Sequence, residues 1–335
     1  MASPVTTRIC RATARNLAFL ARRLRAGEIV AVPTETVYGL AGNALDPAAC
    51  AKIYRAKGRP ASDPLIVHLY SAAQLPLVCQ PNAAALKLAR RFWPGPLTLV
   101  LPKVHTVPGI VTAGRDSVAV RVPSHPVFRR LLKLTGLPLA APSANPFGYI
   151  SPTTARHVRE GLGGKIRHIL DGGPATIGLE STILDLRNPR QPVILRPGAI
   201  TLADIRRVLR QATERRPAAI KSTASRGQVA PGLLARHYSP HTPVVLHAAI
   251  SPARAAAGDH RDAWIFLRRP PAAKKTEPNI FWLDERGAVA GAARRLFATL
   301  RSVDTQKFRC IHVELAPDRG LGRAINDRLR RAAAR

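Results

Sequence analysis

The chain has 335 residues, of which 46% are hydrophobic, and a formal net charge of +32 at pH 7, so it can bury one large core and a second, smaller one. Its apolar runs end well before the roughly 20 residues that a membrane-spanning helix needs, and its N-terminal residues lack the apolar core of a secretory signal. The four cysteines include no C-x-x-C pair, so we expect a cytoplasmic protein with neither a zinc site nor a disulfide framework.

Residues 1–211 have the pattern of an α/β domain. The predicted helices cover residues 6–27, residues 47–55, a segment that begins near Pro126 and a segment capped by Thr201. The predicted strands cover residues 28–33, 65–69, 97–101, 117–122, 182–186 and 193–196. Strands that alternate with helices over such a length predict one broad, open twisted sheet with helices packed against it.

Residues 212–241 differ from the segment before them. Pro and Gly interrupt a stretch of Ala, Ser, Thr and basic residues with little periodicity, which predicts a linker. The segments that follow are predicted strands at residues 244–246, 263–267 and 311–315, a predicted helix at residues 288–300 and a last helix from about Gly322. Residues 242–335 are therefore predicted to form a smaller α/β domain, whose sequence has neither paired carboxylates nor the spacing of metal ligands.

Three short strings place cations or small polar side chains beside Gly or Pro in predicted loops: Lys57-Gly58-Arg59, Ser143-Ala144-Asn145 and Arg196-Pro197-Gly198. A charge-assisted contact from such a cation contributes about 1.5–3 kcal/mol, so the strings favour a polyanionic ligand such as a nucleoside triphosphate. The glycine-rich loops of the P-loop and Rossmann motifs are missing from the sequence. A nucleotide therefore requires another scaffold, and the alternative for the first string is a solvated basic turn.

Polar residues near the first strands indicate a second ligand. Residues 33–40 crowd hydroxyls and a carboxylate into one turn, which forms either a pocket for a small polar molecule or an ordinary polar turn. His68 lies in an apolar strand, where a satisfied core histidine is the default. Arg121 also lies mid-strand without an obvious acidic neighbour in sequence. Because a buried arginine requires an anionic partner, the carboxylate of a ligand is a candidate.

These strings belong to a longer series that occurs in order along the chain. The series is residues 33–40 (PTETVYGL), 57–60 (KGRP), 64–68 (PLIVH), 121–126 (RVPSHP), 142–145 (PSAN), 180–182 (EST) and 195–198 (LRPG). It resembles the threonylcarbamoyl-AMP synthase family with its YrdC-like domain, over about residues 10–245. Residues 230–232 (APG) and 236–240 (RHYSP) resemble the linker of the long, two-domain form of that family.

The resemblance implies a fold and a reaction. The fold is a YrdC-like catalytic domain over residues 1–211, a linker that closes over the active site, and a smaller Rossmann-like domain over residues 242–335, the last by position and size alone. The enzyme is a nucleotidyltransferase that converts L-threonine, bicarbonate or CO2, and ATP into L-threonylcarbamoyladenylate and pyrophosphate. This is the first step of N6-threonylcarbamoyladenosine formation beside the anticodon of tRNAs that read codons starting with A.

The same resemblance implies a cofactor and partners. Mg²⁺ is expected on the ATP phosphates with water as its other ligand, which explains why the sequence needs no carboxylate cluster and why we expect no metal ligands from the protein. Another protein transfers the threonylcarbamoyl group, so a tRNA or a threonylcarbamoyl-transferase complex is an expected partner. No oligomeric state is predicted.

The resemblance also assigns site residues, with Lys57 and Arg59 as the catalytic cations that neutralise the phosphates. The expected ATP-binding residues are Lys57, Arg59, Asp63, Ser117, Ser143, Asn145, Ser151, Arg196 and Tyr238. The expected threonine-binding residues are Thr36, His68, Arg121, Ala141 and Ser181, with Arg121 pairing the carboxylate. Asp63 departs from the family pattern, since many members have Asn there. Its charge repels ATP unless it turns away, pairs with a cation or helps to hold the metal. Tyr238 is expected to fold over the pocket as a lid.

Two other functions are weighed against this one. The first is a double-stranded RNA- or tRNA-binding module without catalysis, because so basic a chain attracts RNA. The charge is spread at similar density along the chain, however, and RNA-binding modules more often concentrate it in a patch or tail. The second is carbamoyl transfer in hydrogenase maturation, but the proteins of that pathway carry acylphosphatase and zinc-finger segments that this sequence lacks.

Overall fold

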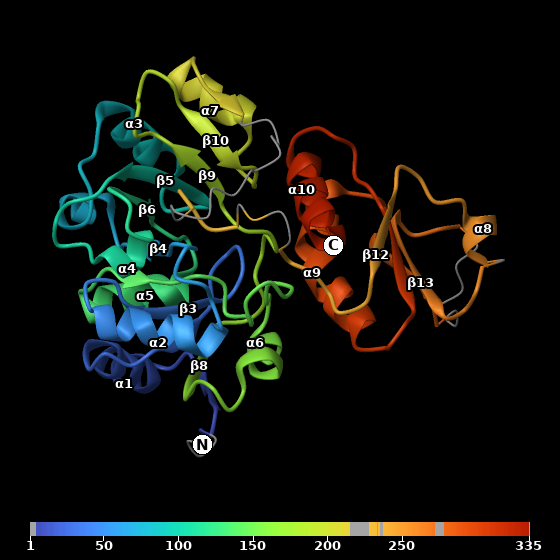
Figure 1. The fold of residues 1–335 in the computed structure, drawn as a ribbon, viewed down its shortest axis with the longest axis horizontal. Helices are drawn as coiled ribbons and strands as arrows, with labels where there is room; N and C mark the ends of the chain where they lie inside the picture. Colours follow the sequence, from blue (N-terminus) through green and yellow to red (C-terminus); the bar gives the residue numbers. More distant parts are fainter. Residues whose placement is uncertain are drawn as a thin grey trace.

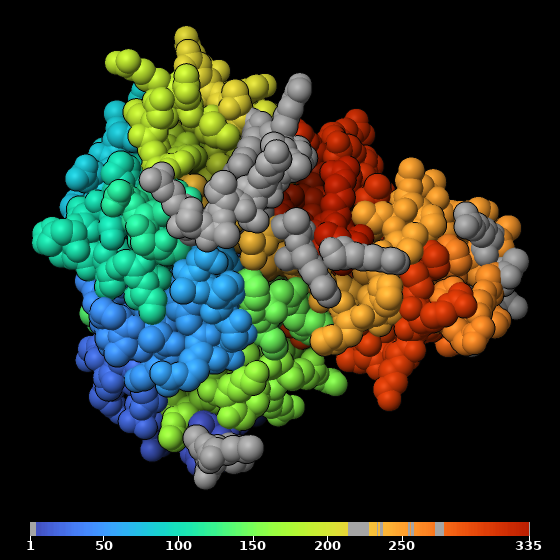
Figure 2. Space-filling model, viewed as in Figure 1, coloured from blue at the N-terminus to red at the C-terminus, as the bar shows by residue number. Residues whose placement is uncertain are grey.

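The computed structural model describes residues 5–214, 228–232, 234, 237–256, 258–271 and 278–334. These residues form a larger and a smaller α/β body that lie side by side (Figure 1). Figure 2 shows the smaller body, in orange and red, packed against the larger one, in blue to yellow. In the described part of the chain no helix is long and apolar enough to cross a membrane.

The larger body is built on one mixed sheet with the strand order β1-β8-β2-β3-β7-β4-β6-β5-β9-β10-β11. Its strands are β1 (Arg8–Arg11), β2 (Val30–Val32), β3 (Gly39–Asn43), β4 (Ile66–His68), β5 (Leu97–Pro102), β6 (Ser117–Arg121), β7 (Leu139–Ala140), β8 (His168–Asp171), β9 (Thr182–Asp185), β10 (Val193–Arg196) and β11 (Thr213–Glu214). Its helices are α1 (Ala14–Arg25), α2 (Pro47–Lys57), the 3-10 helix η1 (Ala72–Leu77), α3 (Ala83–Phe92), α4 (Gly109–Thr112), α5 (Pro126–Thr135), α6 (Ala155–Leu162) and α7 (Leu202–Leu209). The predicted broad sheet with packed helices is confirmed.

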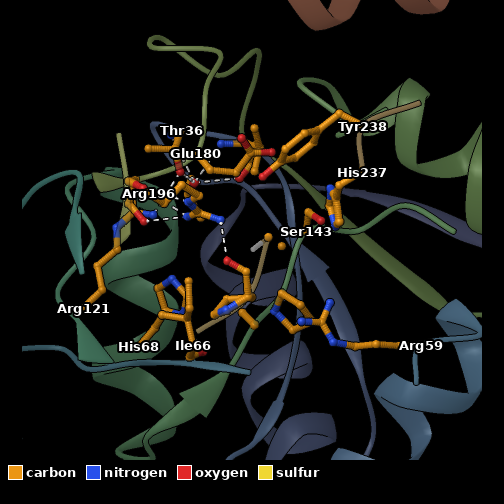
Figure 3. Close-up of a pocket in the computed structure, with 18 residues that line it drawn as sticks. Thr36, Arg59, Ile66, His68, Arg121, Ser143, Glu180, Arg196, His237 and Tyr238 are labelled. Atoms are coloured by element: carbon orange, nitrogen blue, oxygen red, sulfur yellow. Dashed lines mark hydrogen bonds between the residues drawn. The ribbon is translucent and has the colours of Figure 1, made fainter. Parts of the chain in front are cut away.

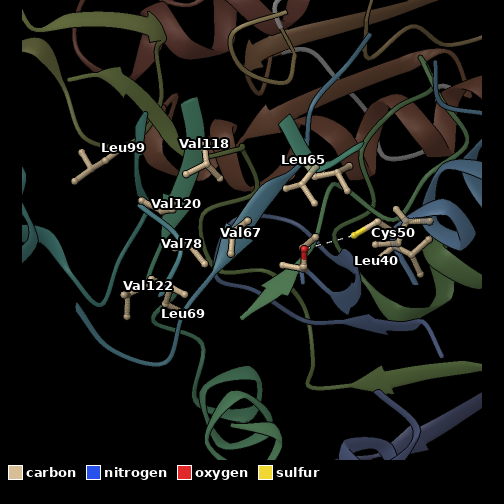
Figure 4. Close-up of a cluster of buried hydrophobic side chains, with 14 of the residues drawn as sticks. Leu40, Cys50, Leu65, Val67, Leu69, Val78, Leu99, Val118, Val120 and Val122 are labelled. Atoms are coloured by element: carbon tan, nitrogen blue, oxygen red, sulfur yellow. Dashed lines mark hydrogen bonds between the residues drawn. The ribbon is translucent and has the colours of Figure 1, made fainter. Parts of the chain in front are cut away.

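Side-chain alternation along the strands separates the core of this body from a polar face. Val118 and Val120 of β6 belong to the main hydrophobic core together with Val67 of β4 (Figure 4). Arg121 of β6 and His68 of β4 are paired in register at the ends of the two strands. Because successive side chains of a strand point to opposite faces, the same strands that bury valines hold Arg121 and His68 on the face away from that core.

The smaller body has a parallel sheet in the order β12-β15-β13-β14. Its elements are β12 (Val244–His247), α8 (Pro252–Ala256), β13 (Asp262–Arg268), β14 (Ile280–Asp284), α9 (Val289–Asp304), β15 (Cys310–Glu314) and α10 (Leu321–Ala333). Helices α9 and α10 lie between this sheet and the larger body (Figure 1). A small α/β unit was the expectation for this part of the chain, and the fold class is confirmed.

Local structure differs from the sequence predictions at several places. Residues 6–27 do not form one helix, because β1 occupies Arg8–Arg11 and Thr13 then caps α1 by accepting a hydrogen bond from the Asn16 amide. Strand β14 and helix α8 were not predicted. Strand β11 pairs with β10 just beyond the predicted domain end at residue 211. Within the predicted linker, residues 215–227, 233, 235 and 236 lie outside the described residues.

The two bodies share a hydrophobic core. Val37, Leu179 and Tyr238 pack in one cluster with side chains of α9 and α10, among them Phe297 and Leu329. Arg301 of α9 also donates hydrogen bonds to the carbonyl oxygens of Ile150 and Ser151 in the larger body. The smaller body is therefore docked directly on loops of the larger one.

Gly178 tests this docking. Its φ is +81°, and a Cβ atom there would lie 2.5 Å from Cα of Arg294 on α9. We expect Gly178→Ala to lower the free energy of unfolding by about 3 kcal/mol or more, since backbone strain and a clash between the bodies combine. Gly114→Ala is the matched control, because Gly114 has a φ of +76° but nothing within 4 Å of a Cβ; there we expect about 1 kcal/mol. Equal losses in urea unfolding of the two variants would show that no close docking exists at Gly178.

Candidate active site

A small pocket with several charged and polar side chains lies where the ends of the central strands meet the chain just before the smaller body (Figure 3). Its lining residues are Thr34, Thr36, Val37, Gly39, Arg59, Ile66, His68, Arg121, Ala141, Pro142, Ser143, Glu180, Ser181, Arg196, Pro231, Gly232, His237 and Tyr238. The space open to the centres of water molecules has a volume of about 40 Å³, enough for a few waters at about 10–15 Å³ each. Any ligand of nucleotide size therefore requires these walls to move apart.

The predicted threonine-binding residues all line this pocket, and Arg121 is the charged member of the set. Its Nη2 atom forms an ion pair of 2.6 Å with Oε1 of Glu35, and its Nη1 atom donates to the Thr36 hydroxyl at 2.9 Å. The anionic partner that a buried arginine requires is thus present in the protein, which the sequence did not indicate. Burial alone would raise the pKa of Glu35, but the charge of Arg121 together with hydrogen bonds from Arg121 and from the backbone outweighs burial, and the pKa is lowered.

His68 is held in the neutral state beside Arg121. The side chain is buried, its Nδ1 atom lies 3.2 Å from the Ile66 carbonyl oxygen, and its ring contacts Phe128. Burial, with the nearby charge of Arg121, lowers the pKa of His68 to about 3. His68 therefore enters the site as an uncharged hydrogen-bonding group at neutral pH.

This pKa predicts an acid dependence of stability. An unfolded histidine has a pKa of about 6.5, so below that pH the unfolded chain takes up a proton that folded His68 does not. The contribution of neutral His68 to the free energy of unfolding should be fully present above about pH 6.5. The free energy of unfolding should then fall by about 2–3 kcal/mol between pH 7 and pH 4.5. His68→Gln should remove this part of the acid slope in urea unfolding. His105→Gln, at an exposed position, should leave the slope unchanged, and equal slopes for wild type and His68→Gln would contradict the prediction.

The remaining threonine-side residues connect to the cationic side of the pocket. The Ser181 and Thr98 hydroxyls lie 2.8 Å apart, and Ser181 also accepts hydrogen bonds from Arg196 through its Oγ atom and its carbonyl oxygen. Ala141 joins the wall through a hydrogen bond from its amide to the Ile66 carbonyl. In the view of Figure 3, Arg121 lies on one side of the pocket and Arg59 on the other.

Four of the predicted ATP-binding residues line the pocket: Arg59, Ser143, Arg196 and Tyr238. Arg59 pairs with the Asp63 carboxylate at 2.9 Å and also donates to the carbonyl oxygens of Asp63 and Pro64. Asp63 thus pairs with a cation, one of the arrangements that the sequence left open. Burial raises the pKa of Asp63 against the opposing charges of Arg59, Lys57 and Arg196.

Lys57 lies behind the pocket wall. Its Nζ atom donates to the carbonyl oxygens of Ser143 at 2.6 Å and Asn145 at 2.5 Å, and burial lowers its pKa well below the usual range. The residue ends α2, and the left-handed turn at Gly58 then returns the chain so that Arg59 faces the pocket. In this conformation Lys57 holds the loop that carries Ser143, whereas a contact with phosphates requires it to leave those carbonyls.

The other predicted nucleotide residues also lie outside the pocket lining. The Asn145 amide donates to the carbonyl oxygens of Pro146 and Tyr149 and leaves its own buried oxygen without a partner among the described residues. The Ser151 hydroxyl donates to Glu180 at 2.5 Å. Ser117 is buried at the end of β6 opposite to Arg121, and its hydroxyl has no partner in the described part of the chain.

Tyr238 covers the pocket from the end of the predicted linker. Its ring stacks on Phe297 at 5.5 Å, and its buried hydroxyl has no hydrogen-bond partner among the described residues. Gly232 makes this cover possible, since a Cβ there would lie 2.7 Å from the Tyr238 hydroxyl and 2.9 Å from Nη1 of Arg196. Neighbouring His237 is buried, and burial together with Arg59, Lys57 and Arg196 lowers its pKa well below the usual range. The cover therefore faces a strongly positive field.

Comparison with known proteins identifies the family of the chain. The family model described as "Telomere recombination" matches residues 22–198, and the one described as "Threonylcarbamoyl-AMP synthase, C-terminal domain" matches residues 200–334. The chain is 41% identical over 320 residues to the threonylcarbamoyl-AMP synthase of Pyrococcus abyssi, with 92% of each chain covered. It is 40% identical over 325 residues to that of Bacillus subtilis, with 95% of this chain and 92% of the other covered. The chain belongs to the threonylcarbamoyl-AMP synthase family.

A solved structure of this family agrees with the fold along nearly the whole chain. The crystal structure of Pyrococcus abyssi Sua5 complexed with L-threonine matches with a TM-score of 0.88 and 39% identity, over 98% of both chains. The predicted YrdC-like fold with a second C-terminal domain is thereby confirmed. At the level of the family, the prediction of a nucleotidyltransferase rather than an RNA-binding module is confirmed as well.

Two carboxylates of this site, Glu180 and Glu35, were not given a role by the sequence patterns. Glu180 lines the pocket, and Arg328 of α10 pairs with it at 2.8 Å from 148 positions further along the chain. Glu35 is the second unassigned carboxylate. Each stands within or next to a motif, but the contact that makes it important is set by the tertiary fold. Local spacing carries no signal for such a contact.

Proposed function

We propose that this chain makes L-threonylcarbamoyladenylate and pyrophosphate from L-threonine, bicarbonate or CO2, and ATP. The observation that carries the proposal is that one pocket brings a threonine-sized set of polar groups around Arg121 together with a cationic set around Arg196 and Arg59. An amino acid and a triphosphate placed in these two sets would meet at Ser181, which Arg196 contacts. Positioning and charge neutralisation are what the reaction asks of the protein.

On the amino-acid side, Arg121 pairs the threonine carboxylate, and Thr36, His68, Ala141 and Ser181 enclose the rest of the molecule. The amine reacts in its neutral form with bicarbonate or CO2 to give a carbamate, and this step releases water from bicarbonate or, with CO2, a proton to solvent. A carbamate oxygen then attacks the α-phosphorus of ATP, the bond to the β-phosphate oxygen breaks, and pyrophosphate leaves. Neutral His68 fits this site, because it can accept or donate a hydrogen bond without adding charge.

On the nucleotide side, Arg59 and Arg196 neutralise the phosphates, with Lys57 behind them. Ser143, Asn145, Ser117 and Ser151 complete the nucleotide pocket, and Asp63 holds Arg59 in place. The described residues contain no group of three or more His, Cys, Asp or Glu that could hold a metal ion. This donor set fits Mg²⁺ that is held through the phosphates and water and supplies charge neutralisation there.

The wider context is part of the same proposal. Residues 1–211 act as the catalytic domain, residues 212–241 as linker and lid, and residues 242–335 as a docked accessory domain. The chain works in the cytoplasm and passes its adenylate to a threonylcarbamoyl-transferase complex or a tRNA-bound transferase.

Tyr238 is proposed to act as the lid that shields the carbamate from water. Tyr238→Ala should lower turnover about tenfold or more and allow ATP hydrolysis without threonine, because an open site admits water. Tyr238→Phe keeps the stacking on Phe297 and should preserve the coupling to threonine. The measurements are pyrophosphate release with threonine and bicarbonate for turnover, and ADP and AMP release without threonine for hydrolysis. Unchanged turnover together with unchanged threonine-independent hydrolysis in Tyr238→Ala would exclude a lid role.

Pyrophosphate release from purified protein, ATP and Mg²⁺ tests the function itself. We expect release only when both threonine and bicarbonate are present. Release that ignores threonine would point to another acceptor or an uncoupled ATPase. No release at any ionic strength, together with RNA binding that weakens steeply with salt, would replace the proposal with the binding-module alternative.

A further inference from the structure

Arg328 of α10 is a buried cation that the smaller body extends to the wall of the pocket. It has 1% of its surface exposed. Its Nε atom donates to Oε2 of Glu180 at 2.8 Å, and its Nη1 atom donates to Asp327 on its own helix at 2.7 Å. Burying the charge of an arginine costs several kcal/mol of desolvation free energy unless anionic partners compensate it. Its partners therefore indicate what it does.

Glu180 is the partner that lies in the pocket. Its two carboxylate oxygens are divided between Ser151, whose hydroxyl donates to Oε1, and Arg328, which donates to Oε2. Arg328 also lies over the ring of Tyr238, with 5.3 Å from its Cζ atom to the ring centroid. One side chain of the smaller body thus fixes a carboxylate of the wall and contacts the cover of the pocket.

A carboxylate in this wall works against the proposed substrate. ATP brings several negative charges into a site of low dielectric, where an unneutralised carboxylate repels them more strongly than it would in water. The pocket cation Arg196 bonds to oxygen atoms of Ser181 and Pro231 rather than to Glu180. The neutralising charge for Glu180 therefore comes from Arg328.

We propose that Arg328 is a positioning residue for ATP binding, through which the C-terminal domain neutralises Glu180 and holds its carboxylate against Ser151. This inference rests on the proposed function, because it needs a polyanion in the pocket. It gives the C-terminal domain a defined part in the active site.

The test is a double-mutant cycle of Arg328→Met and Glu180→Gln in the full chain, read out as the Kd for ATP and as KM values from pyrophosphate release. Arg328→Met in the wild-type background should weaken ATP binding about tenfold or more, since it leaves a buried carboxylate uncompensated. In the Glu180→Gln background the same change should weaken it by less than about twofold, because no charge remains to be neutralised. The KM for threonine should move far less than the KM for ATP.

Arg330→Met is the matched control, because Arg330 is exposed on the same helix and should change none of these values. Equal weakening by Arg328→Met in both backgrounds, or equal rises in the two KM values, would assign Arg328 to interdomain packing alone and overturn the inference. The double variant buries no unpaired charge, so it keeps the test valid where Arg328→Met alone is unstable. Wild-type protein that binds ATP but releases no pyrophosphate would instead refute the proposed function, while the Kd cycle still decides on Arg328.

Discussion

Replacing Arg121 with Met is expected to lower kcat/KM for threonine about 100- to 10,000-fold. A guanidinium that pairs a carboxylate makes two charge-assisted hydrogen bonds of about 1.5–3 kcal/mol each, and about 1.4 kcal/mol corresponds to a factor of ten. Arg121 is buried and already holds Glu35 and Thr36. The measurement is pyrophosphate release as a function of threonine concentration.

The single variant leaves Glu35 buried without its partner, which by itself costs stability. The Arg121→Met, Glu35→Gln double variant removes both charges and isolates the effect on threonine. Wild type should reject threoninamide, which lacks the carboxylate, whereas the double variant should use threonine and threoninamide about equally well. Arg130→Met, at an exposed position on α5, should match wild type. Preserved preference for threonine in the double variant would assign its carboxylate to another residue.

The sequence predicted the part of this site that strand alternation and loop chemistry control. His68 and Arg121 were expected in the middle of apolar strands. Both lie on the expected strands and in register with one another, but as the last residues of β4 and β6 rather than in the middle. Alternation alone places a polar residue on the face opposite to buried valines. The loop of Ser143 and the turn at Arg196 were likewise expected near a ligand, and both line the pocket.

The charge pairing could not be predicted, because it depends on which strand ends meet. Glu35 reaches Arg121, and Arg328 reaches Glu180, across long separations in sequence. The contact of Lys57 could not be predicted from local sequence either. A cation next to glycine suggested a phosphate contact, yet its place as the last residue of α2 turns its ammonium toward two backbone carbonyls.

The helix predicted over residues 6–27 failed for a related reason. Its apolar spacing comes from the α1 residues Leu17, Leu20 and Leu24, which are buried, and this spacing was extended too far toward the N-terminus. Strand β1 lies at the end of the sheet and is mostly exposed, so it carries no clear alternation of polar and apolar residues. An edge strand of this kind is defined by pairing with β8 rather than by its own pattern.

The charge pairing also determines which cation should matter most for ATP. Arg59 forms an ion pair with Asp63, and Arg121 forms one with Glu35. Arg196 instead donates hydrogen bonds to the carbonyl oxygen atoms of Ser181 and Pro231. Burial lowers the pKa of Arg196 against the opposing charge of Glu180, and no carboxylate of the described residues forms an ion pair with it. An unpaired buried cation attracts a phosphate most strongly.

We therefore expect Arg196→Met to raise the KM for ATP about 100-fold, and the Arg59→Met, Asp63→Asn double variant to raise it only about tenfold, because the latter removes a pair with no net charge. Arg196→Lys keeps the charge but loses the planar fork, so it should recover part of the affinity. Arg190→Met, at an exposed position, is the control and should match wild type. The measurement is pyrophosphate release against ATP concentration at saturating threonine. A larger effect from the Arg59 and Asp63 pair than from Arg196 would mean that Arg59 leaves Asp63 when ATP binds, and that Arg59 rather than Arg196 is the principal phosphate ligand.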